Sequence, residues 1–216
     1  MEKNEKLLPL KQGAALVKSA RRAIEEELNK KGGGSDGERG FEPKLEKRGV
    51  FVTIETFPQR ELRGCIGFPE PTHALDAAVR EAALSAAFGD PRFPPVQKKE
   101  FESVTVEISV LTPPELLEEK NPEEIPRKIK IGRDGLIIQR GYASGLLLPI
   151  VPVEWGWSAA EFLEHLCDKA GLPRGSWKDK GVRLFVFESQ VFREKTPRGE
   201  VEEVNFSRDF GVKKRG

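Results

Sequence analysis

The chain has few of the residues that would place it in a specialised class of proteins. Its 216 residues include two Cys, two His, one Met and one Tyr. Two cysteines do not make a disulfide framework, and no apolar run approaches the roughly 20 residues that a membrane-spanning helix needs. No N-terminal apolar segment resembles a signal peptide. We therefore expect a cytoplasmic protein without a membrane segment.

Net charge is also nearly absent. The chain carries 36 basic and 35 acidic residues, which leaves a formal charge of +1. A protein that coats nucleic acid is usually more basic, so general duplex binding is disfavoured, although a local basic patch remains open. The dense basic run at 213–215 is expected to be a solvated terminus. Many charges of both signs, one Met and 16 Pro are typical of a thermophilic protein.

Soft metal ligands are too few and too poorly spaced for a common zinc site. They are Cys65, His73, His165 and Cys167, and the C-x7-H and H-x-C spacings match no usual zinc pattern. We therefore expect no Cys/His zinc site, while a carboxylate-rich site that uses Asp90 or Glu107 stays open. The sequence identifies no cofactor.

Hydrophobic patterning predicts an α+β fold, an antiparallel sheet flanked by helices. Helical periodicity covers 10–28, 73–88 and 158–170, and Ser158 with Glu161 forms a capping-box pattern. The predicted strands are 49–57, 62–68, 104–110, 128–131, 136–139, 146–151 and 184–192. Strands that arrive in hairpins with few helices between them favour α+β over a doubly wound parallel sheet. The glycine-rich stretch 32–40 predicts a loop.

The segment 62–67, LRGCIG, is the strongest candidate for a functional site. Alternation along a strand places Arg63 and Cys65 on one face, and a guanidinium near a thiol favours the reactive thiolate. Amide groups next to Gly64 and Gly67 are candidates for binding an anion. The alternative is that Cys65 is a small buried residue beside a structural arginine.

Two further pairs of polar residues are open to a structural or a functional interpretation. Asp90 and Arg92 either pair locally and hold their proline-rich loop, or the loop presents Arg92 to an anionic ligand. Glu107 and Ser109 lie on the polar face of a strand, which by default is a solvated sheet face.

Five segments in order along the chain resemble the AMMECR-type domain, a family named after a syndrome of Alport disease, midface hypoplasia and elliptocytosis. The segments are 62–67 (LRGCIG), 82–95 (AALSAAFGDPRFPP), 106–111 (VEISVL), 145–149 (GLLLP) and 162–173 (FLEHLCDKAGLP). The resemblance covers about 8–195. Many relatives have Gln after the LLLP segment, where this chain has Ile150, so any ligand contact of that Gln is missing here.

The resemblance implies two lobes with a cleft between them. The larger lobe holds 1–120 and 155–216, and the smaller lobe holds 121–154. The resemblance also implies a set of signature residues in this chain, with Arg63 and Cys65 as the catalytic candidates. The ligand-binding candidates are Gly64, Gly67, Asp90, Arg92, Glu107, Ser109 and Gly145.

The resemblance implies no established reaction, so the functional expectation combines it with the Arg/Cys pattern. We expect an enzyme or enzyme subunit with a Cys/Arg-lined cleft, which acts on a small anionic substrate or one derived from a nucleotide or RNA. The alternative is a non-catalytic module that docks a Memo-type or radical-SAM partner protein. A third interpretation is an RNA-binding module.

Overall fold

The computed structural model describes residues 7–30 and 46–204, so the predicted loop 32–40 and the basic run 213–215 lie outside the described residues. The described chain divides into two compact units. Unit 1 comprises the residues up to Leu111 together with Gln190–Val204, and unit 2 comprises Thr112–Ser189. Strand β7 (Arg183–Glu194) begins in unit 2 and ends in unit 1. Each unit has its own hydrophobic core.

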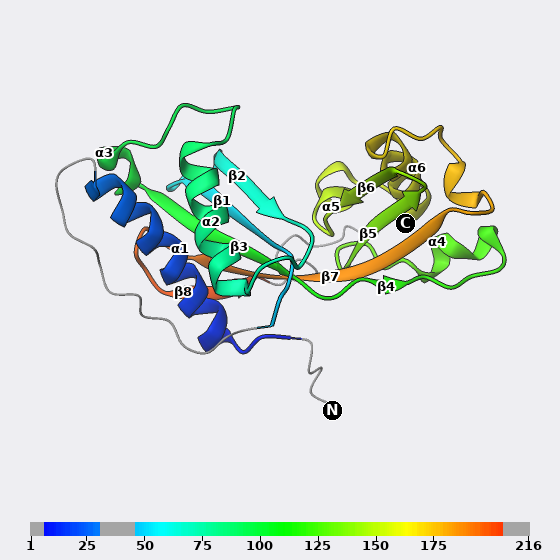
Figure 1. Cartoon of the computed structure of the whole chain (residues 1–216), viewed down its shortest axis with the longest axis horizontal. Helices are drawn as coiled ribbons and strands as arrows, with labels where there is room; N and C mark the ends of the chain where they lie inside the picture. Colours follow the sequence, from blue (N-terminus) through cyan, green and yellow to red (C-terminus); the bar gives the residue numbers. More distant parts are fainter. Residues whose placement is uncertain (1–6, 31–45, 205–216) are drawn as a thin grey trace. The chain divides into compact units, whose positions relative to one another are not determined.

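Unit 1 is an antiparallel sheet with helices α1 and α2 side by side on one face (Figure 1). Its elements are α1 (Leu10–Lys30), β1 (Val50–Thr56), β2 (Leu62–Phe68), α2 (Leu75–Phe88), α3 (Lys98–Phe101), β3 (Val104–Leu111), the end of β7, and β8 (Val201–Val204). The strand order is β2-β1-β3-β7, and β8 pairs with β7. Strand β2 therefore forms an edge of the sheet.

Alternating side chains decide which face of this sheet is buried. Val50, Val52 and Ile54 of β1 point into the core beneath the helices and are fully buried. Phe51 and Thr53 lie on the opposite face and are only partly buried. Because the side chains of a strand alternate, each residue of β1 or β2 points either to the face that α1 and α2 cover or to the opposite face. The face opposite to α1 and α2 is called the helix-free face below.

Helix α1 confirms the helix predicted over 10–28. Val17, Ala20 and Ile24 recur at spacings of three and four and are fully buried together with Leu16, whereas Leu10 at the start of the helix is 46% exposed. The same face also carries a charged residue, Arg21, whose guanidinium is buried against Glu194 of β7. Its Nε and Nη2 atoms lie 2.6 Å from the two carboxylate oxygens of Glu194.

Unit 2 has a smaller sheet, in which β5 (Asp134–Arg140) lies between β7 and β6 (Ala143–Leu147). A short strand β4 (Glu115–Leu116) also pairs with β7. The helical elements are η1 (Pro122–Glu124), α4 (Ile125–Lys128), α5 (Val151–Trp155), α6 (Ala159–Lys169) and η2 (Ser176–Lys178). Helix α6 packs on β5 and β6 (Figure 1), and the predicted capping box of Ser158 and Glu161 is present.

Two strand predictions in unit 2 need correction. The expected strand at 128–131 does not form, because the carboxylate of Asp134 accepts a hydrogen bond from the amide of Lys130 at 2.8 Å and closes a turn there. The expected strand at 146–151 ends earlier, at Leu147. Beyond it the chain enters α5, whose first turn holds Pro152, a residue that suits a helix start.

The fold class is confirmed: the protein is α+β, with an antiparallel sheet and flanking helices. The arrangement as two lobes with a cleft, and the lobe boundaries at 120 and 155, stay predictions. Within 7–30 and 46–204, no helix combines the length and the apolar character that crossing a bilayer requires.

Candidate functional site

One side of strand β2 packs against α2, and this contact explains why position 64 holds a glycine. A Cβ atom added to Gly64 would lie 2.2 Å from the backbone oxygen of Ala86 in α2. No side chain fits there, so glycine allows the helix and the edge strand to approach closely. Ile66, two residues further on, faces the same side and packs against the core. Gly64 therefore has a packing role that is independent of any ligand.

Cys65 points to the opposite, helix-free side of the sheet. Cys65 is partly buried, and the hydroxyl of Thr53 on β1 donates a hydrogen bond to the Cys65 Sγ atom at 3.4 Å. Burial raises the pKa of the Cys65 thiol, while the Thr53 hydrogen bond and the charge of Arg92 act in the opposite direction without cancelling that effect. The resting side chain is thus a neutral thiol at pH 7, which corrects the expectation of a ready thiolate.

The backbone of Cys65 faces outward from the sheet edge, where the ion pair of Asp90 and Arg92 takes the place of a further strand. The Cys65 amide donates to Oδ2 of Asp90 at 2.9 Å, and Nη2 of Arg92 donates to the Cys65 carbonyl at 3.2 Å. Asp90 and Arg92 are joined by two side-chain hydrogen bonds of 2.9 and 2.7 Å. The backbone amide and the backbone carbonyl of Cys65 are thus both hydrogen-bonded to side chains of one loop, the loop that follows α2.

Asp90 itself is buried, although its partner is exposed. Its side chain is 1% exposed, whereas that of Arg92 is 53% exposed. The hydrogen bonds from Arg92 hold the pKa of Asp90 well below its usual range and outweigh the opposing effect of burial. The predicted local pairing of Asp90 and Arg92 is thus present, and the pair leaves part of the Arg92 guanidinium accessible.

Arg63 makes its contacts away from Cys65. The pairing of β1 with β2 shifts by one residue at this point, because Ile54 pairs with Gly64 and the next residue, Glu55, pairs with Leu62. Arg63 is the extra residue of this bulge, and a bulge redirects a side chain. The simple alternation that placed Arg63 beside Cys65 therefore does not apply.

The buried Arg63 side chain holds the loop that follows α2. Its guanidinium pairs with the carboxylate of Glu100 in α3, and Nη2 donates to the carbonyl of Pro94 at 2.8 Å. The guanidinium carbons of Arg63 and Arg92 lie 5.7 and 5.6 Å from the centre of the Phe93 ring. The positive charge that acts on the Cys65 thiol and lowers its pKa comes from Arg92, whereas the carboxylates of Glu107 and Asp90 raise that pKa. Arg63 anchors the loop.

Cys65 belongs to a row of three side chains, one from each of three neighbouring strands, on the helix-free face. Thr53 pairs with Cys65 on one side and with Glu107 of β3 on the other, so the three side chains form a row. Glu107 also lies 3.9 Å from the guanidinium of Arg60. The structure therefore brings Cys65, Asp90, Arg92 and Glu107 to one region of unit 1.

The next row along the same face contains Gly67, Phe51 and Ser109. A Cβ atom on Gly67 would lie 2.3 Å from the backbone oxygen of Val50 and 2.4 Å from the Phe51 ring, so this glycine makes room for both neighbours on β1. Ser109 is buried. Gly67 thus has a packing reason of its own, as Gly64 does, and its role in binding an anion stays a prediction.

Gly145 belongs to unit 2, where its role is also explained by packing. A Cβ atom at Gly145 would lie 2.8 Å from the backbone nitrogen of Ala170 at the end of α6. Ile150 precedes α5 at the N-cap position. The assignment of Gly145 to the same site as Cys65 stays a prediction.

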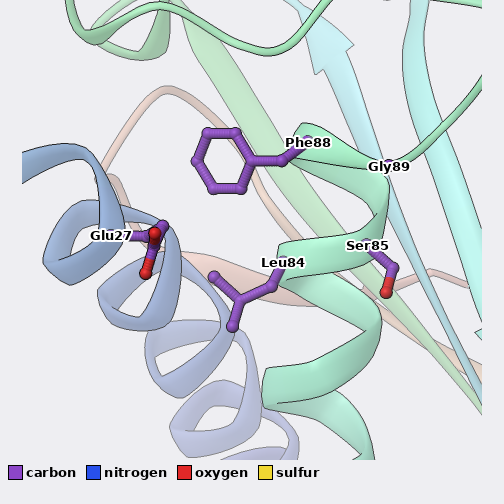
Figure 2. Close-up of a pocket in the computed structure, with 5 residues that line it drawn as sticks. All are labelled: Glu27, Leu84, Ser85, Phe88 and Gly89. Atoms are coloured by element: carbon purple, nitrogen blue, oxygen red, sulfur yellow. The ribbon is translucent and has the colours of Figure 1, made fainter. Parts of the chain in front are cut away.

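A pocket that was not predicted from the sequence lies between α1 and α2 in unit 1 (Figure 2). Its volume is about 360 Å³, and it is lined by Glu27, Leu84, Ser85, Phe88 and Gly89. Leu84 and Phe88 lie one turn apart on α2, which is a pattern visible in the sequence. Nothing in that pattern indicates that Glu27 of another helix faces them.

In the part of the chain that the structure describes, no group of three or more His, Cys, Asp or Glu side chains is arranged to hold a metal ion. Cys167 is fully buried in the core of unit 2, away from solvent. His165 stacks on Trp157 with the ring centres 3.8 Å apart.

Comparison with known proteins identifies similar chains over most of the length. The family model described as AMMECR1 matches residues 17–192. Protein MJ0810 of Methanocaldococcus jannaschii is 54% identical over 198 residues, which cover 91% of this chain and 96% of that protein. Protein PH0010 of Pyrococcus horikoshii is 53% identical over 193 residues, with 88% and 93% covered. The crystal structure of the uncharacterised protein PH0010 matches with a TM-score of 0.79 at 51% identity and covers 90% of this chain and 97% of that chain.

Proposed function

This chain belongs to the AMMECR1 family, and from the geometry of unit 1 we propose that it is an enzyme or enzyme subunit. The names of the matched relatives state no activity. The substrate site is the helix-free face of the sheet around Cys65. The substrate is a small molecule with an anionic group, of the size of a nucleotide or a nucleotide fragment. Cys65 contacts the reacting part of the substrate, and Arg92 holds the anionic group.

The observation that carries this proposal is the fixed position of an exposed guanidinium beside a partly buried thiol. Arg92 is bound to the backbone of Cys65 and to a buried carboxylate, so it has little freedom to move. Among the described residues, its hydrogen bonds use Nε and Nη2, which leaves the Nη1 donors for a ligand. A guanidinium fixed in this way suits a carboxylate or phosphate group.

The chemical role of Cys65 follows from its environment. Since burial raises the pKa of its thiol, Cys65 enters the site as a neutral hydrogen-bond donor. To act as a nucleophile it requires a base. Glu107 lies in the same cross-strand row, with Thr53 between them, and is the carboxylate that we assign to this task.

Protection from alkylation tests the proposal directly. We expect iodoacetamide to modify Cys65 in the folded protein, with Cys167 as the internal control that stays unmodified because it is fully buried. Inorganic phosphate and adenosine monophosphate should each slow the modification of Cys65, and the variant Arg92→Gln should lose this protection. Peptide mass spectrometry measures both sites in one sample. A Cys65 that is inert in the folded protein, or one that neither anion protects, would overturn the proposal.

The variant Cys65→Ser separates a functional thiol from a packing thiol. It removes little volume from a partly buried position, so we expect a melting temperature close to that of the wild type. Turnover, once a substrate is identified by the protection assay, should be lost. A large fall in melting temperature together with an unchanged affinity for phosphate, measured as a binding isotherm, would favour the packing interpretation.

A second candidate function is a module that docks a Memo-type or radical-SAM protein, and the exposed aromatic residues of unit 2 favour it. Trp155 is 70% exposed and stacks on Trp157 with ring centres 6.1 Å apart. Aromatic side chains such as Trp are enriched at protein–protein interfaces. Co-purification with each recombinant partner, repeated with Trp155→Ala, tests this function. Binding of RNA instead would show as a steep fall in affinity with salt.

A further inference from the structure

Strand β2 directs two backbone groups outward from the edge of its sheet. The amide and the carbonyl of Cys65 bond to Asp90 and Arg92 and not to β1, so Cys65 belongs to a non-hydrogen-bonded pair of the ladder. Such pairs alternate with hydrogen-bonded pairs, and the register has no shift between Cys65 and Gly67. The amide and the carbonyl of Gly67 therefore point outward as well, away from β1.

These two groups of Gly67 have no partner in the part of the chain that the structure describes. Strand β2 is the outermost strand, and among the described residues no group outside the ladder bonds to Gly67. Gly67 itself is partly exposed. Unpaired amide and carbonyl groups on an edge strand are a template for another extended chain.

The free part of this edge is one residue long. Two residues before Gly67, both backbone groups of Cys65 are already taken by the loop that follows α2. Two residues after it comes Pro69, which has no N–H and lies beyond the end of β2 at Phe68. The edge thus suits a ligand that resembles one extended amino-acid residue and not a long strand.

The groups along this edge define the ligand's charge and direction. The Gly67 amide comes next after the Cys65 carbonyl, to which Nη2 of Arg92 donates, and the Nη1 donors of Arg92 are uncommitted among the described residues. An acceptor on the Gly67 amide therefore lies beside a fixed guanidinium, which favours an anionic oxygen. In an antiparallel pair one residue supplies both this acceptor and an N–H for the opposite carbonyl, and its carboxyl end points toward Arg92.

We propose that the substrate is an N-acylated amino acid, an α-carboxylate whose nitrogen is an amide N–H. Its carboxylate accepts from the Gly67 amide and from Nη1 of Arg92, and its N–H donates to the Gly67 carbonyl. Side chains of paired residues share a face, so the substrate's side chain lies on the helix-free face, which also carries the Cys65 thiol. The inference rests on the proposed function, in which Arg92 is the anion contact, and names the class of the substrate.

Four probes separate the contacts, and amide NMR spectra of the full chain measure their binding. N-acetylglycine should shift the Gly67 amide in a saturable manner and slow its hydrogen exchange, while the Ile66 amide, which bonds within the ladder, keeps its exchange rate. Acetoxyacetate has the same charge with oxygen in place of N–H and should bind about fivefold more weakly. N-acetylglycinamide lacks the charge and should bind at least about tenfold more weakly. The tripeptide acetyl-Ala-Ala-Gly should bind within about threefold of N-acetylglycine, because the edge pairs with one residue only.

A variant and its control test the guanidinium. Arg92→Gln should weaken the binding of N-acetylglycine about tenfold. Arg140→Gln in unit 2 removes an arginine of similar exposure, 46%, and should change nothing. The probe series uses the wild-type chain, so it decides the question even if Arg92→Gln fails to fold.

The outcomes distinguish this inference from the proposed function. It is overturned if the Gly67 amide does not respond, if N-acetylglycine and acetoxyacetate bind equally, or if the tripeptide binds tenfold more tightly. Protection of Cys65 from alkylation by phosphate would then still support the proposed function. If Cys65 is inert toward iodoacetamide, the proposed function fails, whatever the Gly67 amide shows.

Discussion

The buried ion pair of Arg21 and Glu194 provides the sharpest test of how unit 1 is held together. The two side chains are only 6% and 3% exposed. Arg21 also donates to the carbonyl of Val104 at 2.7 Å, and Oε2 of Glu194 accepts from the amide of Val106 at 3.0 Å. A fifth, longer hydrogen bond runs from Arg21 to the carbonyl of Phe101 at 3.4 Å, so the pair connects α1 to α3, β3 and β7.

Removing one partner leaves the other charge in the interior without compensation. Arg21→Met removes both bonds to Glu194 and leaves its carboxylate buried, so we expect a loss of about 3–5 kcal/mol in the free energy of unfolding. Glu194→Leu leaves the guanidinium with backbone acceptors alone and should cost a similar amount. The double variant leaves no buried charge. The Val106 amide loses its acceptor, which costs about 1–3 kcal/mol, and the carbonyls of Val104 and Phe101 lose the Arg21 donor. The double variant should therefore be more stable than either single variant.

Urea unfolding followed by circular dichroism measures these differences as shifts in the midpoint at constant slope. The matched control is Lys195→Gln, which breaks an exposed pair with Glu200, whose side chains are 45% and 76% exposed. We expect the control to lose less than about 1 kcal/mol. If the losses of the two single variants simply add in the double variant, then the two charges do not depend on each other and the reasoning is wrong.

Three further predictions follow from the site. Gly64→Ala should destabilise the protein by about 1–3 kcal/mol, read as a lower melting temperature, because the added Cβ would lie 2.2 Å from the Ala86 oxygen. Asp90→Asn should cost stability at neutral pH, since Arg92 lowers the pKa of Asp90 in the folded state. A lowered carboxyl pKa stabilises above the unfolded value of about 3.9, so the difference from the wild type should be constant above about pH 5 and shrink as the pH falls below 4. The alkylation rate of Cys65 should rise with pH through a midpoint above that of an unperturbed thiol.

Each of these predictions has a clear contrary result. An unchanged melting temperature in Gly64→Ala would mean that α2 and β2 are not in close contact. For the pH effect, Asp179→Asn is the control, because Asp179 forms an exposed pair with Arg140 and its substitution should give a small difference at every pH. A destabilisation by Asp90→Asn that stays constant down to pH 2 would rule out the proposed link. Alkylation with the midpoint of a free cysteine would mean that the thiol is not buried in solution.

The sequence predicted the elements of the fold where one strong periodic pattern decided them. Helix α1 and the capping box of α6 follow from spacing and end signals that need no tertiary context. The error at 128–131 has a different origin. That segment is short and alternates Lys with Ile, and the turn that replaces the strand depends on a hydrogen bond that the Lys130 amide donates to the side chain of Asp134. A single sequence shows the residue but not that its carboxylate turns back to Lys130.

The candidate site was predicted less well, because the β-bulge at Arg63 interrupts the regular alternation of side chains along β2. Counting by twos places Arg63 beside Cys65, and the extra residue in β2 removes that relation. The arginine that does reach Cys65 is Arg92, 27 residues along the chain. Its local pairing with Asp90 was foreseeable from their spacing, but its contact with the edge of β2 depends on how the loop after α2 returns to the sheet.

The structure thereby sorts the signature residues by what each would lose on substitution. Gly64 and Gly67 are explained by the approach of α2 and of the Phe51 ring, and neither needs a ligand to account for it. Arg63 is explained by the loop that it anchors. Arg92 is only partly explained in this way, since half of its side chain is exposed while its other half is committed to structure. The Arg63 side chain, which holds the loop, is only 11% exposed, so holding a loop does not require exposure. The exposed part of Arg92 beside the Cys65 thiol is therefore where a ligand has the most to gain.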